Sequence, residues 1–381
     1  MRYNFDKVID RSGTSAEKVE GLKHIWGRTD LIPLWVADMD FATAPFVTDA
    51  IRKRCENEVL GYTGKPDSYY NAIINWVKQR YDLVVAKEMI NFVPGIVPGI
   101  GMAMNCFTQK GDKVMIQPPV YHPFAWVTTR NERTLVTNPL KWENGMYRMD
   151  LDTFREQIKG CKLFILCNPH NPGGVVWTEA ELRAIADICY DEKVLVFSDE
   201  IHADLTLPPH THRPFATVSE KARMNSVTFM SPSKAFNMPG LSASHALIFN
   251  EDLRKRFRIY MDAGELDMGH VFAFLSVEAA YSHGTEWLDQ CLAYIQGNID
   301  FVDDFLKNHA PKIKAIRPEA SYLVWLDCRE LKLSQKDLNE FFVDKAHLAL
   351  NDGEMFGKEG IGFMRLNVAS PRCIIEKAMK Q

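Results

Sequence analysis

The chain has 381 residues and a formal net charge of −4, with 46% hydrophobic and 25% charged residues. Its composition is typical of a globular protein, and its length predicts two domains. The mixed charges give no electrostatic argument for binding nucleic acid or an anionic membrane, and no apolar run reaches transmembrane length. Because the first residues also lack the apolar stretch of a signal peptide, we expect a cytoplasmic protein.

The N-terminal third begins with a polar stretch, residues 1–30, that we expect to form an irregular arm. A helix is predicted over Ala44–Leu60, since Pro45 suits a first helical turn and apolar residues recur at helical spacing. A second amphipathic helix is predicted over Tyr69–Tyr81. The Gly-Tyr-Thr-Gly sequence at 61–64 separates the two.

The next segment pairs a short strand, Asn91–Val93, with glycines and prolines that precede a helix reaching about Phe107. The first N–H groups of a helix can bind an anion such as phosphate. The segment lacks the Gly-Lys-Ser/Thr of a P-loop and has only Gly99-x-Gly101 of a dinucleotide fingerprint, so a nicotinamide-dependent oxidoreductase is disfavoured. The following strand, Lys113–Gln117, leads to Tyr121, whose ring could stack on a flat aromatic ligand.

Three buried-looking apolar runs then stop at polar residues, and strand–helix alternation around them predicts a mostly parallel sheet. They are Leu163–Leu166, Val194–Phe197 and Val227–Met230. Because ligands of such sheets lie outside the carboxyl ends of the strands, Asp199, Lys234 and an asparagine after the first run (Asn168 or Asn171) should meet there. Burial lowers the pKa of a lysine, and its neutral amine can form a Schiff base. A lysine, a carboxylate and an amide together suit pyridoxal phosphate (PLP).

The C-terminal part continues with a predicted strand at Leu247–Phe249, helices over 251–263, 269–282 and 286–309, and then a smaller set of elements. A strand at 321–327, a helix at 335–346 and a strand at Phe363–Val368 make up that set. Arg365 lies in the last strand. A buried arginine needs a partner, and its planar fork suits either an internal Asp or Glu or the carboxylate of a ligand.

Cysteine and histidine usage gives little support for other cofactors. The eight cysteines are scattered without a Cys-x-x-Cys pair, so we expect buried thiols and no structural zinc. His202, His210 and His212 could suggest a metal, but no further ligand signal accompanies them, and we predict none.

Six segments carry a family resemblance, in the family's order and over nearly the whole chain. They are Trp35–Phe41, Asn168–Gly174, Ser198–His202, Ser231–Asn237, Asn351–Gly357 and Arg365–Arg372. The chain resembles fold-type I PLP-dependent enzymes of the class I/II aminotransferase superfamily, and within them the MalY/PatB-like cystathionine β-lyase (C–S lyase) branch. The resemblance implies an α/β fold, with a large PLP-binding domain (45–285), a small C-terminal domain (286–381), and an arm that is partly small domain (1–44).

The resemblance also implies roles at the site. Lys234 binds PLP and removes a proton, while Arg365, near Trp35 and Val36, binds the α-carboxylate of the substrate. Tyr62 reaches the phosphate in a neighbouring subunit, which implies a homodimer with a shared site. The remaining cofactor contacts implied are Ile96 and Val97 (phosphate, through their amides), Ser231 and Ser233 (phosphate), Tyr121 (stacking), Asn171 (ring hydroxyl), Asp199 (pyridine nitrogen) and His202.

The activity implied is β-elimination of L-cystathionine or a related cysteine thioether to thiol, pyruvate and ammonia. A class I/II aminotransferase is the alternative, because both reactions begin by removing the same proton. His202 replaces the usual aminotransferase tyrosine, and Ser242 stands where many aminotransferases have an arginine, as in the C–S lyase branch. A PLP-dependent regulatory protein that acts through protein contacts is a second alternative.

Overall fold

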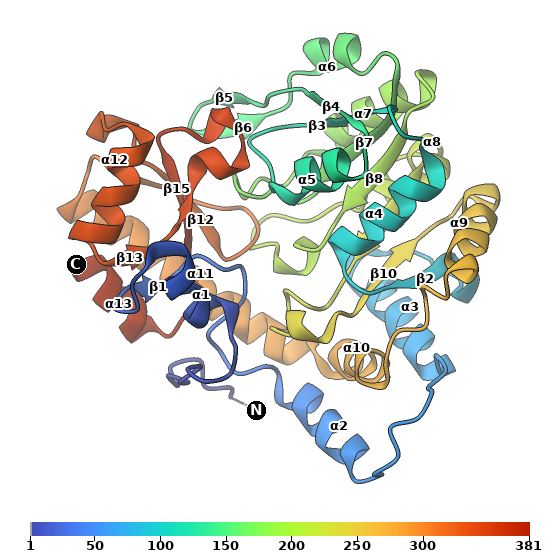
Figure 1. The fold of residues 1–381 in the computed structure, drawn as a ribbon, viewed down its shortest axis with the longest axis horizontal. Helices are drawn as coiled ribbons and strands as arrows, with labels where there is room; N and C mark the ends of the chain where they lie inside the picture. The colour runs from blue at the N-terminus through green and yellow to red at the C-terminus, as the bar shows by residue number, and fades with distance from the viewer. Residues whose placement is uncertain (1) are drawn as a thin grey trace.

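The computed structural model describes residues 2–381 as an α/β fold with one large and one smaller sheet (Figure 1). The large sheet has the strand order β2-β10-β9-β8-β7-β3-β4. Strands β4, β3, β7, β8 and β9 pair in parallel, in that order, while β10 runs antiparallel to both β9 and β2. The strands are β2 (Ile90–Val93), β3 (Lys113–Ile116), β4 (Thr134–Thr137), β7 (Cys161–Cys167), β8 (Leu195–Asp199), β9 (Ser226–Met230) and β10 (Ser244–Leu247). The sheet is therefore mostly parallel, as predicted.

Helices cover both faces of this sheet, so its strands are buried on both sides and read as continuous apolar runs. Alternate side chains enter different cores: Leu163 and Ile165 pack on one face, and Phe164 packs on the other. The first face is covered by α4 (Ile96–Phe107), α5 (Pro123–Arg130) and α9 (Glu251–Ala263). The second is covered by α6 (Leu151–Gln157), α7 (Glu179–Asp191) and α8 (Glu220–Met224).

The smaller sheet is antiparallel and lies near the C-terminus of the chain (Figure 1). Its order is β11 (Lys314–Ile316), β12 (Leu323–Asp327), β15 (Phe363–Asn367), β14 (Asn351–Asp352). The long helix α11 (Thr285–His309) precedes it, and α13 (Arg372–Lys380) follows it. Near the N-terminus, β1 (Ile32–Pro33) pairs in parallel with β13 (Leu348–Ala349). This pairing supports placing part of residues 1–44 with the small domain, although the domain boundaries stay predictions.

The expected irregular arm was wrong in part, because residues Glu17–Trp26 form helix α1. Local signals for this helix are weak. Ala16 at the N-cap makes no side-chain capping bond, and Gly21 within the helix lowers its propensity. Tertiary contacts stabilise it instead, since Lys18 and Leu22 are buried against other segments.

Several predicted boundaries moved. Helix α2 (Pro45–Cys55) ends before Leu60, and α3 (Asp67–Tyr81) and α10 (Val271–His283) pack together behind it. The strand predicted at Leu247–Phe249 is β10 and lies earlier in the chain, because the residues that pair with β9 are His245 to Leu247. The helix predicted over 335–346 is α12 (Gln335–Glu340) followed by a π-helical turn.

The remaining strands, β5 (Lys141–Glu143) and β6 (Met146–Arg148), form a hairpin. No helix within residues 2–381 is long and apolar enough to cross a membrane.

Candidate active site

A cavity of about 210 Å³ lies at the carboxyl ends of β7, β8 and β9. The topology brings residues there from strand ends, from the start of α4 and from the turn after β9. Eight of the residues predicted from the sequence line it: Ile96, Val97, Tyr121, Asn171, Asp199, His202, Ser233 and Lys234. Ser242, which stands where many aminotransferases have an arginine, lines it too.

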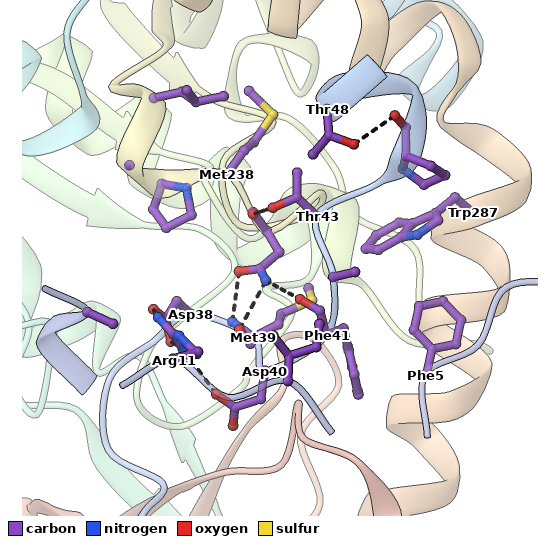
Figure 2. A pocket seen from close by; sticks show the side chains of 18 of the residues that line it. Phe5, Arg11, Asp38, Met39, Asp40, Phe41, Thr43, Thr48, Met238 and Trp287 are labelled. Carbon is purple, nitrogen blue, oxygen red and sulfur yellow. Dashed lines mark hydrogen bonds and ion pairs between the residues drawn. The ribbon is translucent and has the colours of Figure 1, made fainter. Parts of the chain in front are cut away.

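A larger groove of about 990 Å³ lies beside the arm and the N-terminus of α2 (Figure 2). Phe5, Phe41, Met238 and Trp287 give it apolar walls, and Pro239 borders both the groove and the smaller cavity. None of its lining residues is a lysine, cysteine or histidine. The smaller cavity is therefore the place for nucleophilic and acid–base chemistry.

Lys234 reaches into the cavity from the turn that ends β9. Its Nζ donates a 2.5 Å hydrogen bond to the backbone oxygen of Ala37. Burial lowers the pKa of the Lys234 amine to about 8, although Asp38 and Asp199 favour the charged form. A substantial fraction of this amine is therefore neutral near pH 8, which is the form that acts as a nucleophile or base.

Asp199 and His202 are buried polar residues of the cavity lining. Burial raises the pKa of the Asp199 carboxyl to about 7, and its Oδ1 accepts one bond, from the amide of Ile201 at 3.1 Å. Burial lowers the pKa of His202 to about 3, so its ring is neutral, and its Nδ1 has no hydrogen-bond partner. Buried polar groups require partners. The ring nitrogen and hydroxyl of PLP are groups that this pair could satisfy.

The opposite end of the cavity suits an anion. Helix α4 starts at Ile96 after Gly95, whose φ of 140° favours glycine, and no side chain caps the helix. Its first amides therefore lie where a phosphate could accept their hydrogen bonds. Ser233 lines the cavity beside them, whereas Ser231 does not. The Ser231 hydroxyl donates to the oxygen of Ala243 at 2.7 Å and accepts from the amide of Ser233 at 3.1 Å.

Arg365 lies at the centre of the small sheet and is only 4% exposed. Its guanidinium donates to Asn171 Oδ1 at 3.1 Å, to Asn351 Oδ1 at 2.6 Å and to the oxygen of Trp35 at 3.2 Å. Its Nε has no partner, and no carboxylate of residues 2–381 lies within 4.0 Å of it as an ion pair. Burial lowers its pKa to about 10. An internal Asp or Glu partner is thus not seen, and a ligand carboxylate would supply the missing counter-charge.

Five predicted residues lie outside the cavity lining: Ser231 and Arg365, described above, and Trp35, Val36 and Tyr62. Trp35 and Val36 contribute backbone oxygens, the first to Arg365 and the second to Asn367 Nδ2 at 2.6 Å. Tyr62 is 99% exposed and lines a separate surface groove with residues 60–65 and 267–271. It contacts no part of its own chain's cavity.

Sequence reasoning missed two residues at the site. Cys167 ends β7, lines the cavity and accepts a 3.3 Å bond from the amide of Asn171 through its sulfur. Its position at a strand end was a usable signal. Tyr322 donates to the oxygen of Ala37 at 2.9 Å, and nothing in its local sequence indicates that contact.

The histidines considered as metal ligands serve separate contacts. His212 Nε2 lies 2.8 Å from Glu200, and His210 lies 3.7 Å from Glu319, whereas His202 faces the cavity. Within residues 2–381, no three His, Cys, Asp or Glu side chains gather as a metal site would require.

Comparison with known proteins agrees with this geometry. The aminotransferase class I and II family matches residues 29–379, so the chain belongs to that family. It is 38% identical to cystathionine beta-lyase PatB of Bacillus subtilis, over 99% of this chain and 98% of the relative. It is 31% identical to protein MalY of Escherichia coli, over 99% and 97% of the two chains. The structure of the PLP-bound C-S lyase from Staphylococcus hominis superimposes with a TM-score of 0.92 at 35% identity, covering 100% and 97%.

These similarities confirm the fold-type I architecture and the cofactor class that the site residues suit. Within the family, the chain falls in the MalY/PatB-like branch, and it is a PLP-dependent C–S β-lyase.

Proposed function

We propose that this enzyme cleaves the Cβ–S bond of L-cystathionine or a related cysteine thioether, and releases a thiol, pyruvate and ammonia. The observation that carries the proposal is Arg365, a buried cation with no carboxylate partner among residues 2–381. It shares the Asn171 side chain with the cavity that holds Lys234. An amino acid substrate has an α-carboxylate that can pair with Arg365 and a Cα proton that the neutral amine of Lys234 can take.

Arg365, Lys234 and Asp199 have different roles in the proposed elimination. Arg365 binds the α-carboxylate with its planar fork, which orients the Cα–H bond for removal. The Lys234 amine, neutral in part near pH 8, takes the proton from Cα. PLP, when bound, would supply an electron sink for the pair left on Cα, and Asp199 would help keep its pyridine nitrogen protonated. As the thiolate leaves from Cβ with the C–S bonding pair, a Cα–Cβ double bond forms, and hydrolysis of the resulting enamine by one water gives pyruvate and ammonia.

The other predicted residues would hold the cofactor. The amides of Ile96 and Val97 and the hydroxyl of Ser233 would bind the phosphate, and Ser231 would support them by holding the amide of Ser233. The remaining contacts would be Tyr121 stacked on the ring, and Asn171 and His202 at its hydroxyl.

We also propose a homodimer in which Tyr62 completes the phosphate site of the partner. Its full exposure, away from its own cavity, supports this arrangement. Mixing inactive Lys234→Ala and Tyr62→Ala subunits would test it, because hybrid dimers should regain activity at one intact site. A cytoplasmic location stays a prediction.

The decisive experiment measures pyruvate release from L-cystathionine with PLP present and no keto acid. Repeated turnover with homocysteine appearing alongside is the expected result. Turnover that requires an added keto acid would show transamination instead, and would mean that His202 and Ser242 had been over-interpreted.

A further inference from the structure

Residues 35–41, called the strap below, pass beside both functional cations and bind them through backbone oxygens. The oxygen of Ala37 accepts from Lys234 Nζ at 2.5 Å, and the oxygen of Trp35 accepts from Arg365 at 3.2 Å. Tyr322 donates to the same Ala37 oxygen at 2.9 Å. The position of the strap therefore affects the positions of Lys234 and Arg365 together.

Two asparagines hold the strap from the two sheets. Asn237, after β9, accepts from the amide of Met39 at 3.0 Å and donates to the oxygens of Met39 and Phe41 at 3.0 and 2.7 Å. Asn367, in β15, donates to the oxygens of Val36 and Asp38 at 2.6 and 2.7 Å. These bonds are neutral, and they leave the two strap carboxylates to be paired by other residues.

The N-terminal arm supplies both charged partners. Arg11 pairs with Asp38 at 2.6 Å and with Asp40 at 3.0 Å, on one side of the large groove (Figure 2). Lys18, in α1, pairs with Asp40 at 2.8 Å, lies 3.7 Å from Asp38, and is 0% exposed. The cluster thus has two cations and two anions. Without either cation, two largely buried like charges would face each other with incomplete compensation.

We propose that Arg11 and Lys18 are positioning residues that hold the strap, and through it set how tightly Arg365 binds the substrate carboxylate. The strap oxygen of Trp35 is one of three acceptors that orient the Arg365 fork. A shift of the strap would rotate that fork, and an error of even 1 Å in such a group is costly. The inference rests on the proposed role of Arg365.

The test compares Arg11→Gln, Arg11→Lys and Lys18→Met with a matched control, Arg28→Gln. Arg28 also belongs to the N-terminal residues and also bridges two aspartates, Asp30 at 2.6 Å and Asp344 at 2.9 Å, but neither is in the strap. Hydrogen–deuterium exchange of peptides covering the strap is measured on cofactor-free and PLP-loaded protein. KM and kcat for L-cystathionine are measured alongside.

Arg11→Gln should speed exchange in the strap and raise KM about tenfold, since a positioning defect weakens carboxylate binding. A smaller fall in kcat should accompany it, because the strap also accepts a hydrogen bond from Lys234. Arg11→Lys keeps the charge but loses the planar guanidinium, so its strap exchange and KM should lie between those of the wild type and Arg11→Gln. Arg28→Gln should match the wild type in both. If Lys18→Met does not fold, the test rests on Arg11→Gln, because the Arg11 side chain is 23% exposed and its replacement should disturb folding less.

Unchanged exchange and unchanged KM in folded Arg11→Gln would overturn the inference. A rise in KM without faster exchange would also overturn it, since the strap would not be the intermediary. The exchange measurement needs no turnover. A wild-type protein inactive on L-cystathionine would therefore count against the proposed function and not, by itself, against the strap.

Discussion

Lys18 is fully buried and Lys234 is half-buried, and the two lysines have different kinds of partner. Lys18 is 0% exposed and lies within ion-pair distance of two carboxylates, in a cluster completed by Arg11. Lys234 faces a cavity and bonds to the backbone oxygen of Ala37, with no carboxylate ion pair within residues 2–381. Burial accordingly lowers the pKa of Lys234 to about 8.

The comparison shows that the presence of an ion-pair partner, more than the degree of burial, determines the role of a lysine inside the protein. A carboxylate partner favours the charged form of a buried lysine or arginine and can hold two segments together. Burial without such a partner favours the neutral form, or the binding of an anionic ligand. Arg365 belongs to the second kind, since amide and backbone oxygens surround it and no carboxylate pairs with it among the described residues. The predictions below test this division, beginning with the largest expected effect.

Replacing Lys234 by alanine should lower pyruvate release from L-cystathionine by about 10³-fold or more, because the base is removed. The assay is pyruvate formation at saturating PLP, with circular dichroism as a check on folding. Retention of wild-type turnover by folded Lys234→Ala would remove the amine from the reaction.

Lys18→Met should lower the free energy of unfolding by about 3 kcal/mol, because it breaks a buried ion pair and leaves Asp40 without its Lys18 partner. Urea unfolding of the cofactor-free protein measures this. The control is Lys336→Met, which removes an exposed lysine 3.7 Å from Glu340, where a loss below about 1 kcal/mol is expected. Equal losses in the two variants would contradict the division drawn above.

Arg365→Lys should raise KM for L-cystathionine about 30-fold, equivalent to about 2 kcal/mol, because lysine keeps the charge but cannot form the planar fork. Steady-state kinetics separates this from an effect on kcat. Urea unfolding is measured alongside, because the variant also loses guanidinium hydrogen bonds to Asn171, Asn351 and the oxygen of Trp35. An unaltered KM would mean that the substrate carboxylate binds elsewhere.

The smallest effect concerns His245 in β10, whose ring nitrogens have no partners and whose pKa burial lowers to about 3. The unfolded chain, with an ordinary histidine pKa near 6.5, binds a proton that the folded form resists. Stability from this group is therefore present above pH 6.5 and falls as the pH drops towards 3.

Between pH 6.5 and 5.5 this contribution should change by about 1 kcal/mol. His245→Leu should remove it, so that urea midpoints of the variant fall less with acidification than those of the wild type. The difference between the two proteins isolates His245 from Asp199, whose raised pKa acts in the opposite direction. Parallel pH profiles would refute the assignment.

The strand ends were predictable because buried parallel strands leave a strong local pattern. The runs before Asn168, Asp199 and Ser231 became β7, β8 and β9, and the helix after Gly95 became α4. Elements whose stability comes from distant partners were not visible in this way, as α1 and the early end of α2 show.

The sequence by itself determined the chemistry at the strand ends, because apolar runs, turn residues and a lysine, an aspartate and an arginine at family positions are local features. Only the tertiary structure decided which charges are paired. Lys18 and Asp40 are separated by 22 residues, and Asn171 and Arg365 by 194. Contacts at such separations depend on how two sheets and an arm pack together, and electrostatic free energies depend on that packing far more than on residue type.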